Sequence, residues 1–126
     1  MNSRILLCLV AMVGLMSGAQ SALAASQAVR DMAGIMVHLE HYPSSDEKGK
    51  LKSIADNMAS TAHERVLARA IMNLKHKADA EDKDKLKQVM DDTAAPAEVR
   101  ELAGIILNIS HMPSASDKGK LEKMMK

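Results

Sequence analysis

The chain has 126 residues, a formal net charge of +1, one aromatic residue and one cysteine, a size that allows one small domain at most. The near-neutral charge argues against a nucleic-acid binder, which requires a clear excess of basic residues. Ala, Leu, Met, Lys, Glu and Asp dominate, whereas β-branched and aromatic residues are few. This composition predicts an all-α fold.

Residues 1–24 have the pattern of a signal peptide. Arg4 gives a short basic region, an apolar core of about a dozen residues follows, and Ala22-Leu23-Ala24 fits a cleavage site after Ala24. The core is shorter than the roughly 20 apolar residues that span a bilayer, so we expect no stable membrane insertion after processing. Cys8 is removed with this segment, and the remaining sixteen basic and sixteen acidic residues cancel. The expected product is a neutral periplasmic or secreted domain of residues 25–126.

The domain contains an internal repeat. Residues 29–51 match residues 99–121 at 12 of 23 positions without a gap, and a weaker match at half that offset gives a period of 35. Periods of this size are typical of stacked helical hairpins. We therefore predict three tandem helix-turn-helix repeats, approximately 26–60, 61–95 and 96–126. Their six short helices would form a small α-solenoid or a closed helical bundle.

The predicted elements recur in chain order within each copy. The first helix has apolar residues at helical spacing and ends before Pro43 or Pro113 where a proline is present. The second helix opens with a capping-box pattern such as Ser44-x-x-Glu47, while Thr61-x-x-Glu64 and Pro96 mark the starts of the third and fifth helices. The buried positions predicted for the first helices are Met32, Met36, Leu39, Leu67, Ile71, Leu74, Leu102, Ile106 and Ile109. Those predicted for the second helices are Leu51, Ile54, Ala55, Met58, Leu86, Val89, Met90, Leu121, Met124 and Met125.

The first and third copies contain continuous apolar runs, at residues 34–37 and 104–107, where the middle copy has Arg69. A helix that is apolar on most of its circumference requires burial on more than one side. Either the first and third hairpins pack against each other, or the runs contact a second subunit or another partner. The predicted partner-binding residues are Gly34, Ile35, Val37, Gly104, Ile105, Leu107, Arg30, Arg65 and Arg100. The three arginines could instead form ion pairs with acids such as Asp56 or Asp91.

Three histidines, His41, His76 and His111, occupy equivalent positions in the three copies. Equivalent atoms of stacked hairpins lie about 10 Å apart, whereas ligands of one ion lie within about 2.3 Å of it. We therefore predict that these histidines cap helix carbonyl groups and do not share a metal ion. His38 and His41 remain the one pair with ligand spacing, and their imidazoles suit copper or zinc.

Lysines recur in the first turns of the predicted second helices, where a cation opposes the helix dipole. An anion such as a lipid head group, or an acidic partner, would explain this choice. Interleaved acidic residues also allow a solvated edge of mixed charge. The lysines concerned are Lys48, Lys50, Lys83, Lys85, Lys118 and Lys120.

No motif for catalysis is present in the sequence, which has neither a Gly-x-Ser-x-Gly nucleophile turn, nor a phosphate-binding glycine loop, nor a His-Glu-x-x-His zinc helix. We expect a non-enzymatic protein without a cofactor. The leading prediction is an exported interaction or adaptor protein that binds an envelope protein or peptide, or assembles as a homodimer. The alternatives are a periplasmic copper or zinc carrier or sensor, and an envelope stress chaperone with a methionine-rich surface.

Overall fold

The computed structural model describes residues 25–126, and the predicted signal peptide with Cys8 lies outside the described residues. The fold is all-α, as predicted, and the described part of the chain forms six helices. None of these helices is long and apolar enough to cross a membrane. The helices are α1 (Gln27–Val37), α2 (Ser45–Asp56), α3 (Ala62–Met72), α4 (Ala80–Asp91), α5 (Ala97–Asn108) and α6 (Ala115–Met124).

Most of the predicted helix starts are confirmed by their capping bonds. Ser44 forms a full capping box with Glu47, and the hydroxyl groups of Thr61 and Ser114 accept backbone N–H groups at the starts of α3 and α6. Asp79 precedes α4 but makes no side-chain cap. Asp82, three residues further on, is buried and accepts a hydrogen bond of 3.0 Å from the side-chain amide of Asn73.

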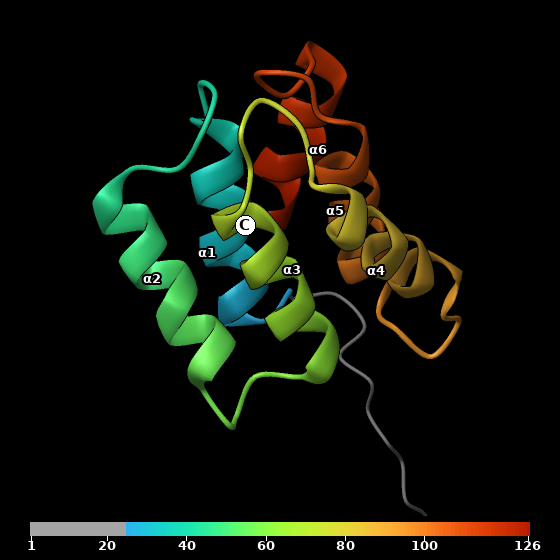
Figure 1. The fold of residues 1–126 in the computed structure, drawn as a ribbon. Coiled ribbons are helices and arrows are strands. Elements are labelled where there is room, and N and C mark those ends of the chain that lie inside the picture. Colours follow the sequence, from blue (N-terminus) through green and yellow to red (C-terminus); the bar gives the residue numbers. More distant parts are fainter. Residues whose placement is uncertain (1–24) are drawn as a thin grey trace, which may run out of the picture.

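The six helices form an inner and an outer group. Helices α1, α3 and α5 each contact the other two at the centre of the molecule, and α2, α4 and α6 lie outside them (Figure 1). The closest packing joins α2 to α3, α4 to α5, and α6 to α1. Because α6 packs against α1, the last helix pair contacts the first. The chain therefore adopts the closed arrangement, and its helix pairs are related by an approximate three-fold rotation.

The apolar stripe predicted for the first helices is buried as expected. Met32, Leu67 and Leu102 are fully inaccessible, and the equivalent positions one and two turns further along are also buried. Three methionines predicted to be buried in the second helices are exposed instead, Met90 by 36%, Met125 by 41% and Met58 by 87%. Met58 is the most exposed because α2 ends at Asp56, so that Met58 belongs to the following loop.

Candidate metal centre

The turn that joins the two helices of each pair contains one histidine. His41 lies between α1 and α2, His76 between α3 and α4, and His111 between α5 and α6, and all three turns lie at the same end of the molecule (Figure 1). The three histidines have φ values of 150°, 68° and 69°, and they are the three non-glycine residues with positive φ in the described chain. Such conformations cost free energy and are found preferentially at functional sites.

The side chains of the three histidines converge. The Nδ1 atoms of His41 and His76 are 3.2 Å apart, those of His76 and His111 are 2.9 Å apart, and those of His111 and His41 are 3.4 Å apart. The ring planes are inclined to one another by 63° to 87°, so each pair of rings meets edge to face. We call these three residues the histidine cluster.

The prediction that the three histidines lie too far apart to share an ion is wrong. It assumed that successive hairpins are related by translation, which separates equivalent atoms by the distance between packed helices. The helix pairs are instead arranged by rotation, and residues near a rotation axis meet their equivalents. The turns follow the ends of the inner helices and therefore lie near that axis.

The convergence of three Nδ1 atoms favours a cation over a proton network. A neutral imidazole has one in-plane site at Nδ1, which holds either a proton or a lone pair. One shared proton can satisfy two of the three nitrogens, and the third then has no partner within the cluster. A metal ion accepts all three lone pairs at once, so the arrangement suits metal coordination.

The spacing of the nitrogens also fits a metal centre. Nitrogens at 2.0–2.1 Å from a tetrahedral zinc ion are about 3.3 Å apart, and the observed separations run from 2.9 to 3.4 Å. All three histidines are exposed, so an ion bound to them would face solvent on its remaining side. Three imidazoles with one open position constitute the ligand set of a zinc or copper site, because magnesium and calcium prefer oxygen ligands.

His38 is not part of the histidine cluster. Helix α1 ends at Val37, and His38 is its exposed C-cap residue; the N–H of the next residue, Leu39, donates to the carbonyl of Met36 at 3.2 Å. His38 and His41 therefore do not lie on one helix face, as the sequence interpretation required. The structure instead combines His41 with His76 and His111, which that interpretation had dismissed.

The predicted apolar partner surface lies largely inside the protein. Ile35, Val37 and Ile105 are buried in the core, while Gly34, Gly104 and Leu107 are partly exposed. Helix α6 packs against α1 and helix α4 packs against α5, and these two contacts supply the additional burial that the apolar runs require. The side chains of Ile35, Val37 and Ile105 are therefore not available to a partner in this fold.

The three arginines at the starts of the inner helices are all partly buried. Arg30 donates a hydrogen bond of 3.0 Å to Gln27, and Nε of Arg100 is buried without a hydrogen-bond partner. Within residues 25–126 the three arginines form no salt bridge, so the proposed ion pairs with Asp56 or Asp91 are absent; Asp56 pairs with Lys52 at 2.7 Å.

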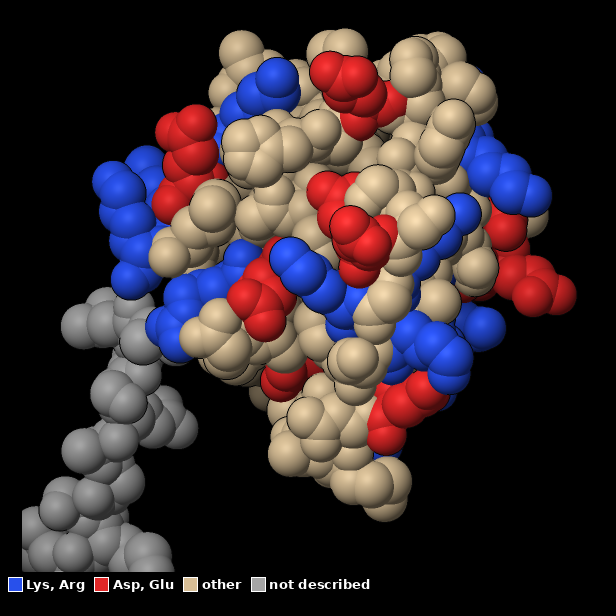
Figure 2. All heavy atoms as spheres, turned by 90° about the vertical axis from the view of Figure 1, so that its left-hand side faces the viewer, with Lys and Arg blue, Asp and Glu red and all other residues tan. Residues whose placement is uncertain are grey.

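The six repeated lysines are distributed over α2, α4 and α6. These outer helices do not contact one another in the described chain, so no helix contact joins the lysines into a single surface. Figure 2 shows the side of the molecule on the left of Figure 1, where basic and acidic side chains are interspersed. Anion binding by these lysines stays a prediction.

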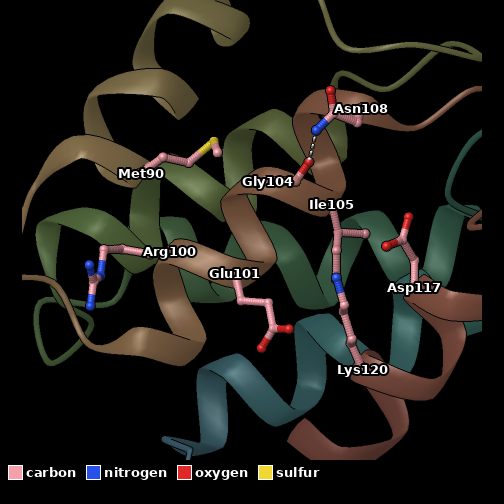
Figure 3. Close-up of a pocket in the computed structure, with 8 residues that line it drawn as sticks. All are labelled: Met90, Arg100, Glu101, Gly104, Ile105, Asn108, Asp117 and Lys120. Atoms are coloured by element: carbon pink, nitrogen blue, oxygen red, sulfur yellow. Dashed lines mark hydrogen bonds between the residues drawn. The ribbon is translucent and has the colours of Figure 1, made fainter.

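A shallow pocket of about 250 Å³ lies beside α5 and is lined by Met90, Arg100, Glu101, Gly104, Ile105, Asn108, Asp117 and Lys120. In Figure 3, Met90 and Arg100 lie on one side of α5, and Asp117 and Lys120 lie on the other. The charged groups therefore do not point at a common position. The histidine cluster is the stronger candidate for a functional site.

Comparison of the chain with protein-family models, with curated proteins and with solved structures finds no match.

Proposed function

We propose that the protein is a non-enzymatic metal-binding protein that takes one zinc or copper ion at the histidine cluster. The observation that carries this proposal is the approach of three Nδ1 atoms from three separate turns to within 3.4 Å of one another. The positive φ of all three histidines supports it, because a fold retains such strain where the resulting geometry has a use.

An accessible site suits a carrier or sensor better than a structural centre. Structural zinc sites are closed by four protein ligands, whereas this cluster offers three exposed imidazoles. An ion held in this way can exchange its remaining ligand with solvent or with an acceptor protein. We therefore propose reversible binding, with the ion passed to or received from a partner.

The experiment that tests this function is a titration of the purified, tag-free protein with Zn²⁺ and Cu²⁺ by calorimetry. We expect one ion per chain, and we expect His76→Ala or His111→Ala to weaken binding by at least about 100-fold. His38→Ala is the matched control and leaves the affinity unchanged. Absence of tight binding, or an equal loss in the His38→Ala variant, would refute the proposal.

Export remains part of the proposed function. The basic, apolar and small-residue regions of residues 1–24 support a signal peptide that is cleaved after Ala24. The mature protein would then act in the periplasm or outside the cell. The mass of the protein recovered from the periplasmic fraction tests this, because it must correspond to a chain that begins at Ala25.

The three-repeat organisation also remains a proposal. It is supported by the starts of α1, α3 and α5 at residues 27, 62 and 97, and of α2, α4 and α6 at residues 45, 80 and 115. Both series advance by 35 residues. The recurrence of histidine at the same point of each copy agrees with the same organisation.

A second candidate function is the interaction module that binds an envelope protein or peptide. Tyr42 and Met112, which directly follow two histidines of the cluster, support it, because these side chains are 63% and 49% exposed. Large exposed apolar groups beside a metal site provide a surface for an acceptor protein. The variant Tyr42→Ala, Met112→Ala would then bind metal normally and lose a partner captured from the envelope. A homodimer or a chaperone activity of the methionine-rich chain has no more specific support in the structure.

A further inference from the structure

The ring of helices has one seam without a covalent connection. Residues 57–61 join α2 to α3, and residues 92–96 join α4 to α5, so two of the three closest helix contacts are tethered by short loops. The third contact, between α6 and α1, joins elements from opposite ends of the described chain. Non-covalent packing alone holds this seam closed.

The set of backbone hydrogen bonds that joins the three histidines also lacks one bond at this seam. The N–H of His76 donates to the carbonyl of His41 at 2.9 Å, and the N–H of His111 donates to the carbonyl of His76 at 2.7 Å. A third bond, from His41 to His111, would complete the cycle, but it is absent from the backbone bonds of residues 25–126. His41 correspondingly has a different φ, 150°, from the 68° and 69° of the other two.

The side chains of His41 and His111 approach each other at the boundary where the backbone hydrogen bond is absent. His41 belongs to the first helix pair and His111 to the third, and their Nδ1 atoms are 3.4 Å apart, the longest separation in the cluster. An ion that coordinates both rings connects the two pairs directly across the seam. The same ion adds less stability at the other two boundaries between helix pairs, because a backbone hydrogen bond already joins the pairs there.

We propose that the metal ion acts as a latch that holds the seam between α6 and α1 closed. This inference rests on the proposed metal-binding function. Because the closed ring presents three ligands and the opened ring at most two on adjacent pairs, the ion binds the closed form more tightly. Metal binding and ring closure are then linked, and each favours the other.

Hydrogen exchange of the purified, tag-free protein with and without Zn²⁺ tests the latch. In the metal-free protein, amides of α1 and α6 should exchange at least about ten-fold faster than those of α3, because the seam opens before the molecule unfolds globally. Saturation with zinc should remove this difference. Equal exchange of the two groups in the metal-free protein would overturn the proposal.

Two variants with the same number of ligands sharpen the test. His76→Ala keeps His41 and His111, which still bridge the seam, whereas His41→Ala keeps His76 and His111, which do not. At equal zinc occupancy, established by equilibrium dialysis, only His76→Ala should retain slow exchange in α1 and α6. Equal protection in both variants refutes the latch. A wild-type protein that binds no zinc refutes the metal-binding function itself, and one that binds zinc without protecting the seam refutes the latch alone.

Discussion

Gly104 of α5 lies directly beneath the side chain of Met90 from α4, and a Cβ atom added to the glycine would be 3.4 Å from the Cε methyl group. Gly34 of α1 and Met125, at the end of α6, have the same relationship at 3.5 Å. In the third equivalent contact the inner helix carries the large side chain and the outer helix the small one. Arg69 of α3 extends over Ala55 of α2, and its guanidinium group lies 3.5 Å from the carbonyl oxygen of Ala55. The contact between the first and middle copies therefore differs from the other two equivalent contacts through a paired change of residue size.

This relationship predicts that Gly104→Ala stabilises the protein. Alanine is favoured over glycine within a helix by about 1 kcal/mol, and the new methyl group would meet the flexible end of Met90 at ordinary contact distance. Chemical denaturation should show an increase of up to about 1 kcal/mol in the free energy of unfolding.

Gly119→Ala in α6 is the matched control, since nothing lies within 4 Å of a Cβ at that position. The difference between the two variants measures the cost of moving Met90. If Gly104→Ala were destabilised relative to the wild type, the contact would be rigid and the close approach of α4 and α5 would require glycine.

The backbone conformation of His76 predicts that glycine is preferred to alanine at this position. Its φ of 68° lies in the left-handed region, where a Cβ atom costs roughly 1–2 kcal/mol. Both His76→Gly and His76→Ala remove the ring, so their difference isolates the backbone. We expect the glycine variant to be more stable by about 0.5–1 kcal/mol in thermal and chemical denaturation, after allowance for its more flexible unfolded chain.

His38 provides the opposite expectation, because its φ of −102° is readily adopted by any residue. His38→Gly should be less stable than His38→Ala. The same ranking at both positions would argue against strain in the histidine turns.

The helices were predictable because their signals are local. The positions of Met32, Leu67 and Leu102 follow from helical spacing, and Ser44 and Thr61 mark helix starts through their own side chains. The closure of the ring was left open between two alternatives, because both bury the same apolar runs. The choice depends on the angle between successive helix pairs, which depends on packing details such as Met125 against Gly34.

The convergence of the three histidines was not predicted for the same reason. Translation and rotation of the helix pairs give the same sequence period, yet only rotation brings the histidines together. One signal in the sequence does distinguish them from their surroundings: the residues before the histidines are Glu40, Lys75 and Ser110, and those after them also differ, while the histidine is unchanged. A single invariant residue in an otherwise divergent turn indicates a requirement specific to that side chain.

The contacts of Asp92 predict that its carboxylate stabilises the folded protein to an extent that depends on pH. The backbone N–H of Ala94 and the ring of His63, at 2.9 and 2.8 Å from the carboxylate oxygens, hold the pKa of Asp92 below its ordinary value. A carboxyl group with a lowered pKa in the folded state stabilises that state above the pKa of the unfolded chain, and loses the effect as the pH falls through the folded value. Asp92→Asn should therefore lower the Tm at pH 7, and the difference between the two proteins should shrink as the pH falls below about 4.

Asp91 is adjacent and has no hydrogen bond or salt bridge from its side chain in the described structure, so Asp91→Asn serves as the control for the loss of one surface charge. Its Tm should remain close to that of the wild type across the same pH range. A parallel loss in both variants would show that net charge, and not the contacts of Asp92, determines the effect.

Zinc binding at the histidine cluster should weaken as the pH falls from 7.5 to 5.5. Imidazole binds metal through a nitrogen lone pair in its neutral form, so protons compete with the ion for the same nitrogens. All three coordinating nitrogens are open to this competition, so the affinity for zinc should be lower at pH 5.5 than at pH 7.5. Zinc at 100 times its Kd stabilises the folded state by about 2.7 kcal/mol, and the zinc-induced rise in Tm should therefore be large at pH 7.5 and small at pH 5.5 for the same zinc concentration.

His38→Ala should reproduce this profile, whereas His111→Ala should show a small zinc-induced shift in Tm at both pH values. A zinc-induced shift that is independent of pH would place the ion on carboxylate ligands and away from the cluster.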